Sequence, residues 1–299
     1  MIQLDGLTKR YGDVLAVDDL TFTVRPGQVT GFLGPNGAGK TTTMRMILGL
    51  DLPTSGTATI NGRAHHELRH PLREVGSMLE AQAVHPRRSA YKHLLYLAQT
   101  NAIPDVRVAE VLDLVGLTAV AGRKAGEFSL GMGQRLGIAA ALLGDPPVLM
   151  LDEPVNGLDP EGVLWIRTLI RGLAAEGRTV LVSSHLMSEM ALTADRLVVI
   201  GKGRLIAEGE IDDFTEGGAA VFVRTPDAAS FARRLELSGA HVRPGGADEL
   251  LVTGMTAPDV GRLAAAEGVP LFELAPRRAS LEETFMELTR ESVEYGAAR

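Results

Sequence analysis

The sequence predicts an α/β protein built on a mainly parallel sheet, followed by a second, smaller α/β domain. Short apolar runs such as 29–33 and 148–151 end in glycine or acidic residues, as buried strands do. Segments with apolar residues three and four positions apart, such as 40–50 and 164–175, lie between such runs. Strands that alternate with helices form a parallel sheet covered on both faces.

The first sixty residues predict an antiparallel sheet instead. Apolar residues alternate with polar ones in 2–7 and 20–24, and Tyr-Gly and Pro-Gly turns follow these stretches. A further strand that ends at Ile60 is expected after the turn at 53–56. Alternation bounded by turn residues is typical of antiparallel strands.

Residues 86–143 are predicted to be mostly helical, and we expect a helical subdomain over about residues 83–145. Helical spacing recurs there in 90–98, 106–115 and 134–143. The parallel core then continues. Its further elements are predicted at 164–175 (helix), 179–183 (strand), 186–193 (helix) and 196–200 (strand).

The pattern changes near residues 209–219, where three glycines loosen the chain and the stretch 210–213 is polar. We therefore expect two domains, 1–215 and 220–299, both within the usual size range. In the second domain, strands are predicted at 220–224, 241–243, 250–253 and 271–275, and helices at 228–237, 258–266 and 281–289.

Composition narrows the class of protein. The 299 residues are 45% hydrophobic and 22% charged, with a net charge of −7 and no cysteine. This balance is globular, and the absence of cysteine excludes disulfides and thiolate chemistry. The acidic charge disfavours nucleic-acid binding, so no nucleic-acid partner is expected. No apolar run reaches the roughly 18 residues of a membrane span and no signal region begins the chain, so a cytoplasmic location is expected.

A glycine-rich loop carries the strongest chemical signal. It matches the phosphate-loop pattern G-x-x-x-x-G-K-[ST], with an apolar strand before it and a helix after it. In such loops backbone N–H groups face a phosphate, the lysine reaches the β- and γ-phosphates, and the hydroxyl holds Mg²⁺. The sequence therefore predicts a nucleoside triphosphate site. Its residues are Gly34, Pro35, Asn36, Gly37, Ala38, Gly39, Lys40, Thr41 and the following Thr42.

A second element supplies acidic groups for the same chemistry. The apolar run 148–151 ends at Asp152 and Glu153, which is the Walker B pattern. At the carboxyl end of a strand the two carboxylates can take different roles. Asp152 is predicted to hold Mg²⁺ through its hydration shell, and Glu153 to polarise the water that attacks the γ-phosphate.

The segment 128–135, with the sequence FSLGMGQR, lies shortly before this strand at the predicted start of a helix. It resembles the L-S-G-G-Q signature of the ATP-binding cassette subunits of ABC transporters, in the variant form F-S-L-G-M. Ser129 and Gly131 are placed at a helix N-terminus to donate hydrogen bonds to a phosphate. The resemblance covers about residues 2–215 and implies a P-loop NTPase fold of the ATP-binding cassette type.

Further motifs follow in the order of that family. Asp159 lies in a segment that resembles the D-loop, and His185 resembles the switch histidine that senses the γ-phosphate. Tyr11 stands where the family places an aromatic ring against adenine, and stacking of a base on an aromatic ring is worth about 1–3 kcal/mol. The resemblance thus implies catalytic roles for Lys40, Glu153 and His185.

One position departs from the family pattern. After the corresponding strand the family has a glutamine, which touches Mg²⁺ and the attacking water. Here the best register places Glu80 at that position, whereas Gln82 fills it if the loop shifts by two residues. A carboxylate can still bind Mg²⁺, but it adds negative charge beside the triphosphate. Glu80 together with the F-S-L-G-M form resembles the antibiotic-exporter subgroup of the family.

The resemblance implies an ATPase subunit that powers a separate membrane permease, with export of an antibiotic or another drug expected. In the family the signature faces the nucleotide of the opposite subunit. Two cassettes, as a homodimer or with a homologous cassette, are therefore expected to enclose ATP and Mg²⁺ at the inner face of the cell membrane. The rival interpretations are an importer ATPase, a soluble cassette ATPase acting on ribosomes or DNA, and another kind of phosphate-loop enzyme.

Overall fold

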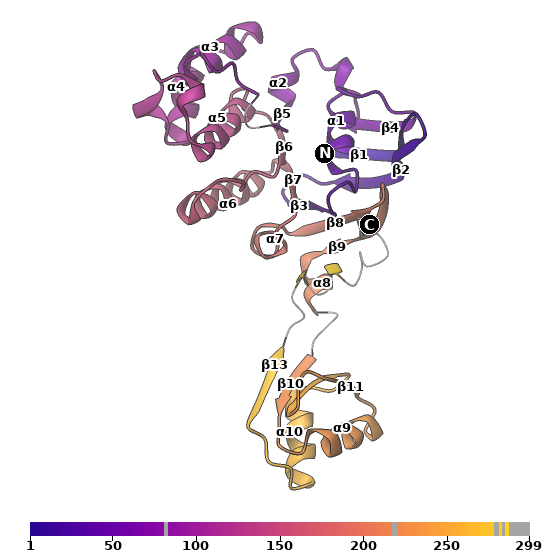
Figure 1. Cartoon of the computed structure of the whole chain (residues 1–299). Helices are drawn as coiled ribbons and strands as arrows, with labels where there is room; N and C mark the ends of the chain where they lie inside the picture. Colours follow the sequence, from indigo (N-terminus) through magenta and orange to yellow (C-terminus); the bar gives the residue numbers. More distant parts are fainter. Residues whose placement is uncertain (81–82, 217–219, 278–280, 283–284, 287–299) are drawn as a thin grey trace, which may run out of the picture. The chain divides into compact units, whose positions relative to one another are not determined.

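The computed structural model of the chain describes all residues except five short stretches. These stretches are 81–82, 217–219, 278–280, 283–284 and 287–299. The chain divides into two compact units, Met1–Gly209 and Glu210–Glu287 (Figure 1).

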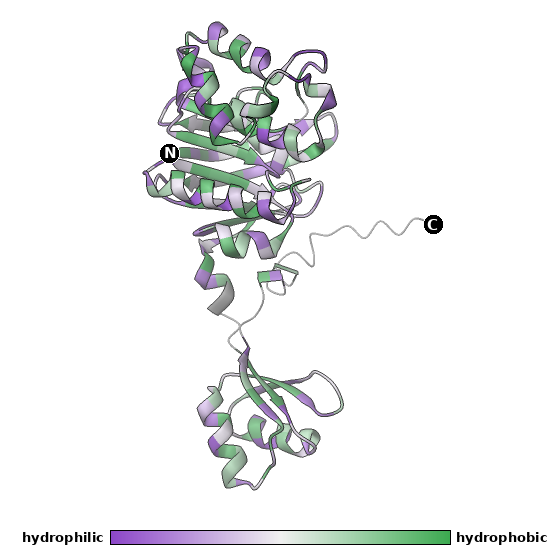
Figure 2. Ribbon diagram, turned by 90° about the vertical axis from the view of Figure 1, so that its left-hand side faces the viewer, coloured by the Kyte–Doolittle hydropathy of each residue, from purple (hydrophilic) through white to green (hydrophobic). Residues whose placement is uncertain are grey.

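A six-stranded sheet forms the centre of the first unit, in the order β5-β6-β7-β3-β8-β9. The pairs from β5 to β8 are all parallel. The strands β3 and β7 are buried along their whole length, which explains why their sequences are almost continuously apolar. Figure 2 shows hydrophobic strands lying between the helices of this unit. The bounds are Val29–Leu33 (β3), Val75–Met78 (β5), Val148–Asp152 (β6), Thr179–Ser184 (β7), Arg196–Gly201 (β8) and Arg204–Glu210 (β9).

Helices connect these strands as expected for a parallel sheet. One helix follows β3, another lies between β6 and β7 in the sequence, and a third lies between β7 and β8. Their bounds are Lys40–Ile47 (α1), Pro160–Ala175 (α6) and Met187–Thr193 (α7). Shorter helical turns occur at His65–Glu67, Pro71–Glu74 (α2), Thr118–Val120 and Ala125–Glu127.

A three-stranded antiparallel sheet, in the order β2-β1-β4, comes from the first sixty residues. Its inward side chains share one core with β3 and α1. The rings of Phe22 and Phe32 pack there with 5.4 Å between their centroids. The predicted antiparallel arrangement is therefore confirmed. The bounds are Ile2–Tyr11 (β1), Val14–Val24 (β2) and Ser55–Ile60 (β4).

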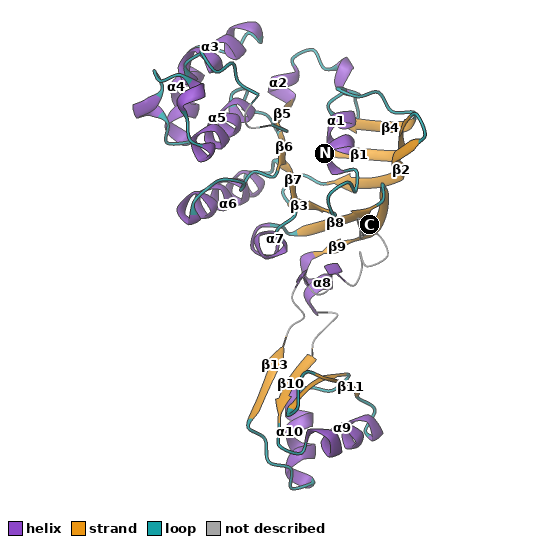
Figure 3. Cartoon of the chain, in the orientation of Figure 1, coloured by secondary structure: helices purple, strands orange, loops and turns teal. Residues whose placement is uncertain are grey.

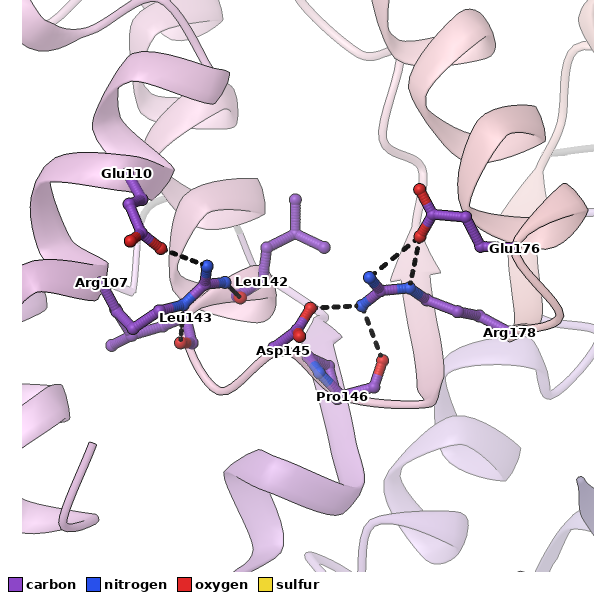
Figure 4. Close-up of polar contacts among 8 residues, drawn as sticks. All are labelled: Arg107, Glu110, Leu142, Leu143, Asp145, Pro146, Glu176 and Arg178. Atoms are coloured by element: carbon purple, nitrogen blue, oxygen red, sulfur yellow. Dashed lines mark hydrogen bonds and ion pairs between the residues drawn. The ribbon is translucent and has the colours of Figure 1, made fainter. Parts of the chain in front are cut away.

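Three helices form the helical subdomain, and α5 leads from it back into the sheet. Two arginines brace this connection (Figure 4). Arg107 donates hydrogen bonds to the carbonyl oxygens of Leu142 (3.1 Å) and Leu143 (3.4 Å). Arg178 pairs with Asp145 at 2.8 Å. Both ends of the connection are thereby fixed. The bounds are Ala90–Thr100 (α3), Val106–Leu114 (α4) and Leu130–Leu142 (α5).

The second unit contains an antiparallel sheet in the order β11-β12-β10-β13. Two helices pack on it in a β-α-β-β-α-β succession, the ferredoxin-like arrangement (Figure 3). Phe231, Val223 and Val252 are fully buried between helix and sheet. The bounds are Ile211–Glu216 (α8), Ala220–Arg224 (β10), Ala228–Leu237 (α9), His241–Pro244 (β11), Glu249–Thr253 (β12), Ala257–Ala266 (α10) and Glu273–Arg277 (β13).

Several element boundaries differ from the sequence prediction. The helices α5 and α6 each begin four residues early, because Ser129 and Asp159 cap their N-termini. Neither β9 nor α8 was predicted. The strand β9 is a half-exposed edge strand, and α8 begins in the polar stretch 210–213. The last strand begins at Glu273, two residues after its predicted start. Most of the helix predicted at 281–289 lies outside the described residues.

Within the described ranges, no helix is both long enough and apolar enough to cross a bilayer.

Gly76 in β5 offers a test of how tightly the helical subdomain packs on the sheet. A Cβ at this position would clash with the Ala141 carbonyl oxygen of α5. We expect Gly76→Ala to lower the free energy of unfolding by about 1–3 kcal/mol, the usual cost of overpacking. Gly172→Ala is the matched control, because a Cβ there meets no neighbour and the position is exposed in α6. It should stabilise by about 0.5–1 kcal/mol. Urea unfolding of both variants measures the difference, and equal stabilities would contradict the packing.

Candidate active site

Three neighbouring parallel strands bring the predicted catalytic groups to one edge of the sheet. In the ladder, Asp152 at the end of β6 pairs with Ser183 of β7, and Leu33 of β3 pairs with Ser184. The phosphate loop therefore begins beside the strand ends that carry the acidic pair and His185. Open α/β sheets bind ligands at the carboxyl ends of their strands.

The loop 34–39 curls tightly between β3 and α1. Gly39 has a φ of 101°, and a Cβ there would lie 2.6 Å from the Ala16 carbonyl oxygen, so only glycine fits. The Ala38 N–H donates to the Pro35 carbonyl oxygen at 3.1 Å. A curled loop that ends in a helix N-terminus is the arrangement that binds phosphate. Of the other residues predicted to bind phosphate, Ala38 is buried and Thr42, in α1, is half-buried. Asn36 and Gly37 are exposed.

Lys40 begins α1 with its side chain folded back over the loop. Its Nζ donates to the carbonyl oxygens of Gly34 at 2.5 Å and Pro35 at 3.3 Å, and the residue is 8% exposed. Burial lowers the pKa of the Lys40 ammonium, and the nearby carboxylates of Glu153 and Asp152 oppose this shift. The loop thus holds a buried cation close to the two predicted acidic residues.

The Thr41 hydroxyl joins the loop to β6. Its Oγ1 donates to Asp152 Oδ2 at 2.9 Å, and Ser183 Oγ donates to the other carboxylate oxygen. Hydroxyl and carboxylate oxygens are the ligands that Mg²⁺ prefers. At nucleotide sites Mg²⁺ needs one or two such protein ligands, because phosphates and water supply the others. The donor set at Thr41 and Asp152 therefore fits this ion.

Glu153 leaves the strand in a turn that few side-chain-bearing residues adopt. Its φ is 50°, in the left-handed region. Its N–H donates to the carbonyl oxygen of Ser183 at 3.2 Å and to Ser183 Oγ at 3.1 Å. Its Oε2 lies 2.7 Å from His185 Nδ1. Two of the predicted catalytic groups are therefore in direct contact.

Tyr11, at the end of β1, is 45% exposed. Its hydroxyl donates to Asp51 Oδ2 at 2.8 Å, and the Lys9 ammonium lies 4.8 Å from the centre of its ring. Arg45 donates to the same carboxylate at 2.7 Å. The hydrogen bonds from Arg45 and Tyr11 lower the pKa of Asp51. The ring is thereby fixed in an exposed position beside the antiparallel sheet.

The signature residues lie at the N-terminus of α5. Ser129 Oγ accepts a hydrogen bond from the Met132 N–H at 3.3 Å, so it caps the helix. A Cβ at Gly131 would lie 3.0 Å from the Gly157 carbonyl oxygen, which shows how close this turn runs to the segment after β6. Asp159 Oδ1 accepts from the Gly162 N–H at 2.9 Å and caps α6.

Glu80 follows β5 and is exposed. Its negative charge is one of the influences that raise the pKa of Arg45, after the hydrogen bond from Arg45 to Asp51. Within the described part of the chain it forms no hydrogen bond with Thr41 or Asp152. Gln82, the other candidate for this position, lies outside the described residues.

Sequence reasoning missed two polar residues that touch the site. Ser183 donates to Asp152, and Gln134 of α5 donates to the Glu153 carbonyl oxygen at 3.0 Å. Gln134 is 4% exposed. A glutamine at a buried position of a helix needs a hydrogen-bond partner, and this requirement is the signal that could have drawn attention to it.

Comparison with known families agrees with this geometry. The family model described as ABC transporter matches residues 17–156, and a model for a domain of unknown function matches residues 219–282. The Nod factor export ATP-binding protein I of Burkholderia orbicola is 37% identical, over 96% of this chain and 96% of that protein. The bacitracin transport ATP-binding protein BcrA of Bacillus licheniformis is 44% identical, over 71% of this chain and 70% of that protein.

Solved structures extend the likeness to the fold. The dimeric bacterial ABC transporter cassette MJ0796 superposes with a TM-score of 0.65 at 26% identity, covering 71% of this chain and 99% of that one. The same cassette has been solved in a post-hydrolysis state with ADP and phosphate. Since the relatives, the fold and the ordered motifs agree, this chain belongs to the ATP-binding proteins of ABC transporters and is an ATPase that converts ATP to ADP and phosphate.

Proposed function

We propose that this ATPase powers a separate membrane permease of the antibiotic- or multidrug-export type. The observation that carries the proposal is that two contacting pairs, Thr41 with Asp152 and Glu153 with His185, lie at one edge of the sheet within electrostatic reach of Lys40. Nod factor export and bacitracin transport, named for two relatives, support export as the direction. The permease would take up the movement of the cassette as mechanical work.

Each group of the site has a role in hydrolysis under this proposal. The phosphates of ATP replace the loop carbonyls as partners of Lys40, and the Tyr11 ring stacks on adenine. Mg²⁺, held by Thr41 and Asp152 with Glu80 nearby, would neutralise charge on the phosphates. Glu153 polarises the attacking water, and His185, which already touches its carboxylate, contacts the γ-phosphate.

We further propose that two cassettes are needed for one working site. Ser129, Gly131 and Asp159 would face the ATP of a second copy or of a homologous cassette. In the described part of this chain none of them hydrogen-bonds to the phosphate loop, and the dimeric cassette MJ0796 supports such an arrangement. ATP binding would then close the dimer and hydrolysis would reopen it, which is a ligand-driven shift between two states.

The domain division and the location belong to the same proposal. Residues 1–215 would form the cassette and residues 220–299 a separate domain, as the two family matches support. The permease would hold the protein at the inner face of the cell membrane. No nucleic acid is expected among its partners, because the net charge is −7.

Replacement of Lys40 tests the phosphate loop. We expect Lys40→Ala to weaken ATP binding roughly 10- to 100-fold, because hydrogen bonds to a charged group contribute about 1.5–3 kcal/mol. Titration with a fluorescent ATP analogue measures the dissociation constant. Lys92→Ala, on the exposed face of α3, is the control and should bind like the parent. Unchanged affinity in Lys40→Ala would overturn the assignment of the loop.

Replacement of Glu153 tests the function as a whole. Tagged Glu153→Gln should bind ATP but hydrolyse it far more slowly than the parent, and it should accumulate as a closed dimer in size-exclusion chromatography. Extracted gently from host membranes with ATP, it should carry an integral membrane protein in stoichiometric amount. The double variant Lys40→Ala/Glu153→Gln should remain monomeric, because it lacks tight ATP binding.

Two results would count against the export proposal in different ways. Recovery with ribosomes or DNA in the soluble fraction would favour a soluble cassette ATPase. A co-purified permease that moves its substrate inward in reconstituted vesicles would make the protein an importer subunit. Both results leave the ATPase site intact.

Glu80 is tested through the metal dependence of turnover. We expect Glu80→Gln to keep ATP affinity within about twofold, because the phosphate loop supplies most of the contacts, and to change kcat or the Mg²⁺ concentration at half-maximal rate. Steady-state assays over a Mg²⁺ series measure both. Gln82→Ala is the comparison variant. If only Gln82→Ala alters the Mg²⁺ response, Glu80 does not occupy the metal-sensing position.

A further inference from the structure

Gln134 is a buried polar residue that reaches the candidate catalytic glutamate from another subdomain. It lies one turn into α5, is 4% exposed, and donates through Nε2 to the Glu153 carbonyl oxygen at 3.0 Å. A buried amide without a partner would be costly, so this hydrogen bond defines where the side chain stays. It is a direct link between the helical subdomain and the peptide of Glu153.

The peptide that Gln134 contacts is already in an unusual conformation. Glu153 has a φ of 50°, and its N–H is held by the backbone and the hydroxyl of Ser183 in β7. Its carbonyl oxygen accepts from the Asn156 N–H at 3.2 Å and from Gln134. A left-handed residue with a side chain persists only where its surroundings fix it from several directions. The sheet fixes one side of this peptide and α5 fixes the other.

The helix α5 touches the same segment at a second point. Near its first residue, Leu130 packs against Gly157, where a Cβ would clash with the leucine side chain. The segment 153–157 is therefore contacted at both ends, by Gln134 at Glu153 and by Leu130 at Gly157. Because side chains four apart lie on one face of a helix, one face of α5 makes both contacts. A displacement of α5 relative to β6 would have to move this segment.

We propose that Gln134 is a positioning residue that couples the place of the signature helix to the direction of the Glu153 carboxylate. This inference rests on the proposed role of Glu153 as the group that polarises water. When α5 sits as described, Gln134 holds the turn that sets Glu153 beside His185. When α5 shifts, the hydrogen bond is lost and the carboxylate leaves its working position. The helix that carries the signature would thereby permit or prevent hydrolysis.

The single tryptophan supplies an internal reporter for this helix. Trp165 of α6 lies under the guanidinium of Arg135, the next residue along α5, at 4.3 Å from the ring centre. Arg135 also donates to the Val115 carbonyl oxygen at 3.0 Å. Trp165 emission therefore reports whether α5 keeps its place in a variant, independently of ATP hydrolysis.

The test compares Gln134→Met, which keeps the size of the side chain and removes the donor, with the parent. We expect kcat to fall roughly 10- to 100-fold, the scale on which a misplaced catalytic group loses rate, while KM and ATP affinity change less than about twofold. Trp165 emission and the melting temperature should stay close to those of the parent. Gln99→Met, at an exposed position of α3, is the matched control and should retain full activity.

A double variant guards against a folding defect. In the background of Glu153→Gln, Gln134→Met should cause no additional loss of the residual rate, because Gln134 acts through Glu153. Equal losses in both backgrounds would show a general structural role and overturn the inference.

The outcomes separate this inference from the proposed function. If Glu153→Gln hydrolyses ATP at the parental rate, the role of Glu153 fails and the coupling fails with it. If Glu153→Gln is inactive but Gln134→Met keeps the parental kcat, the proposed function stands and the coupling alone is wrong. A parallel loss of ATP affinity, or a shifted Trp165 emission, would assign Gln134 to the stability of α5 instead.

Discussion

The adjacency of β6, β7 and β3 in one parallel sheet is the constraint on which the site depends. Thr41 and Asp152 are separated by 111 positions in the sequence, yet they share a hydrogen bond of 2.9 Å. This is possible because the strands run in one direction and end at one edge, so the segments that follow them meet there. The ladders of β7 with β3 and with β6 set the register in which these strand ends meet. The positions of the phosphate loop, the acidic pair and His185 follow from that register.

Glu153 shows how this edge is completed by groups outside the strands. Its left-handed backbone costs on the order of 1–3 kcal/mol, and the hydrogen bonds from Ser183 and Gln134 help to offset this cost. The first bond comes from the sheet and the second from the helical subdomain. A strand that simply continued past Asp152 would have sent the next side chain to the opposite face. The turn instead sets Glu153 beside His185, so the strained residue lies where the proposed chemistry occurs.

The sequence alone was sufficient to predict those motifs that depend only on their own local backbone. The phosphate loop and the acidic pair each combine a strand end or helix start with particular residues nearby, and the structure has these elements in place. Reasoning from sequence failed where the partner is distant. Nothing close to Gln134 in the chain indicates that its amide reaches a carbonyl 19 positions away. The edge strand β9 was missed for another reason, because its exposed residues lack the continuous apolar run of the buried strands.

The departure at Glu80 is best understood through charge. A carboxylate in place of glutamine adds a negative charge to the loop after β5, near the proposed triphosphate. The nearby guanidinium of Arg45 is held by Asp51, and the same carboxylate accepts the hydroxyl of Tyr11. The hydrogen bond to Asp51 and then the charges around it, including that of Glu80, raise the pKa of Arg45. The charge of Glu80 is thus within electrostatic reach of the Arg45 guanidinium. Arg45 lies in α1, the helix that also carries Lys40 and Thr41.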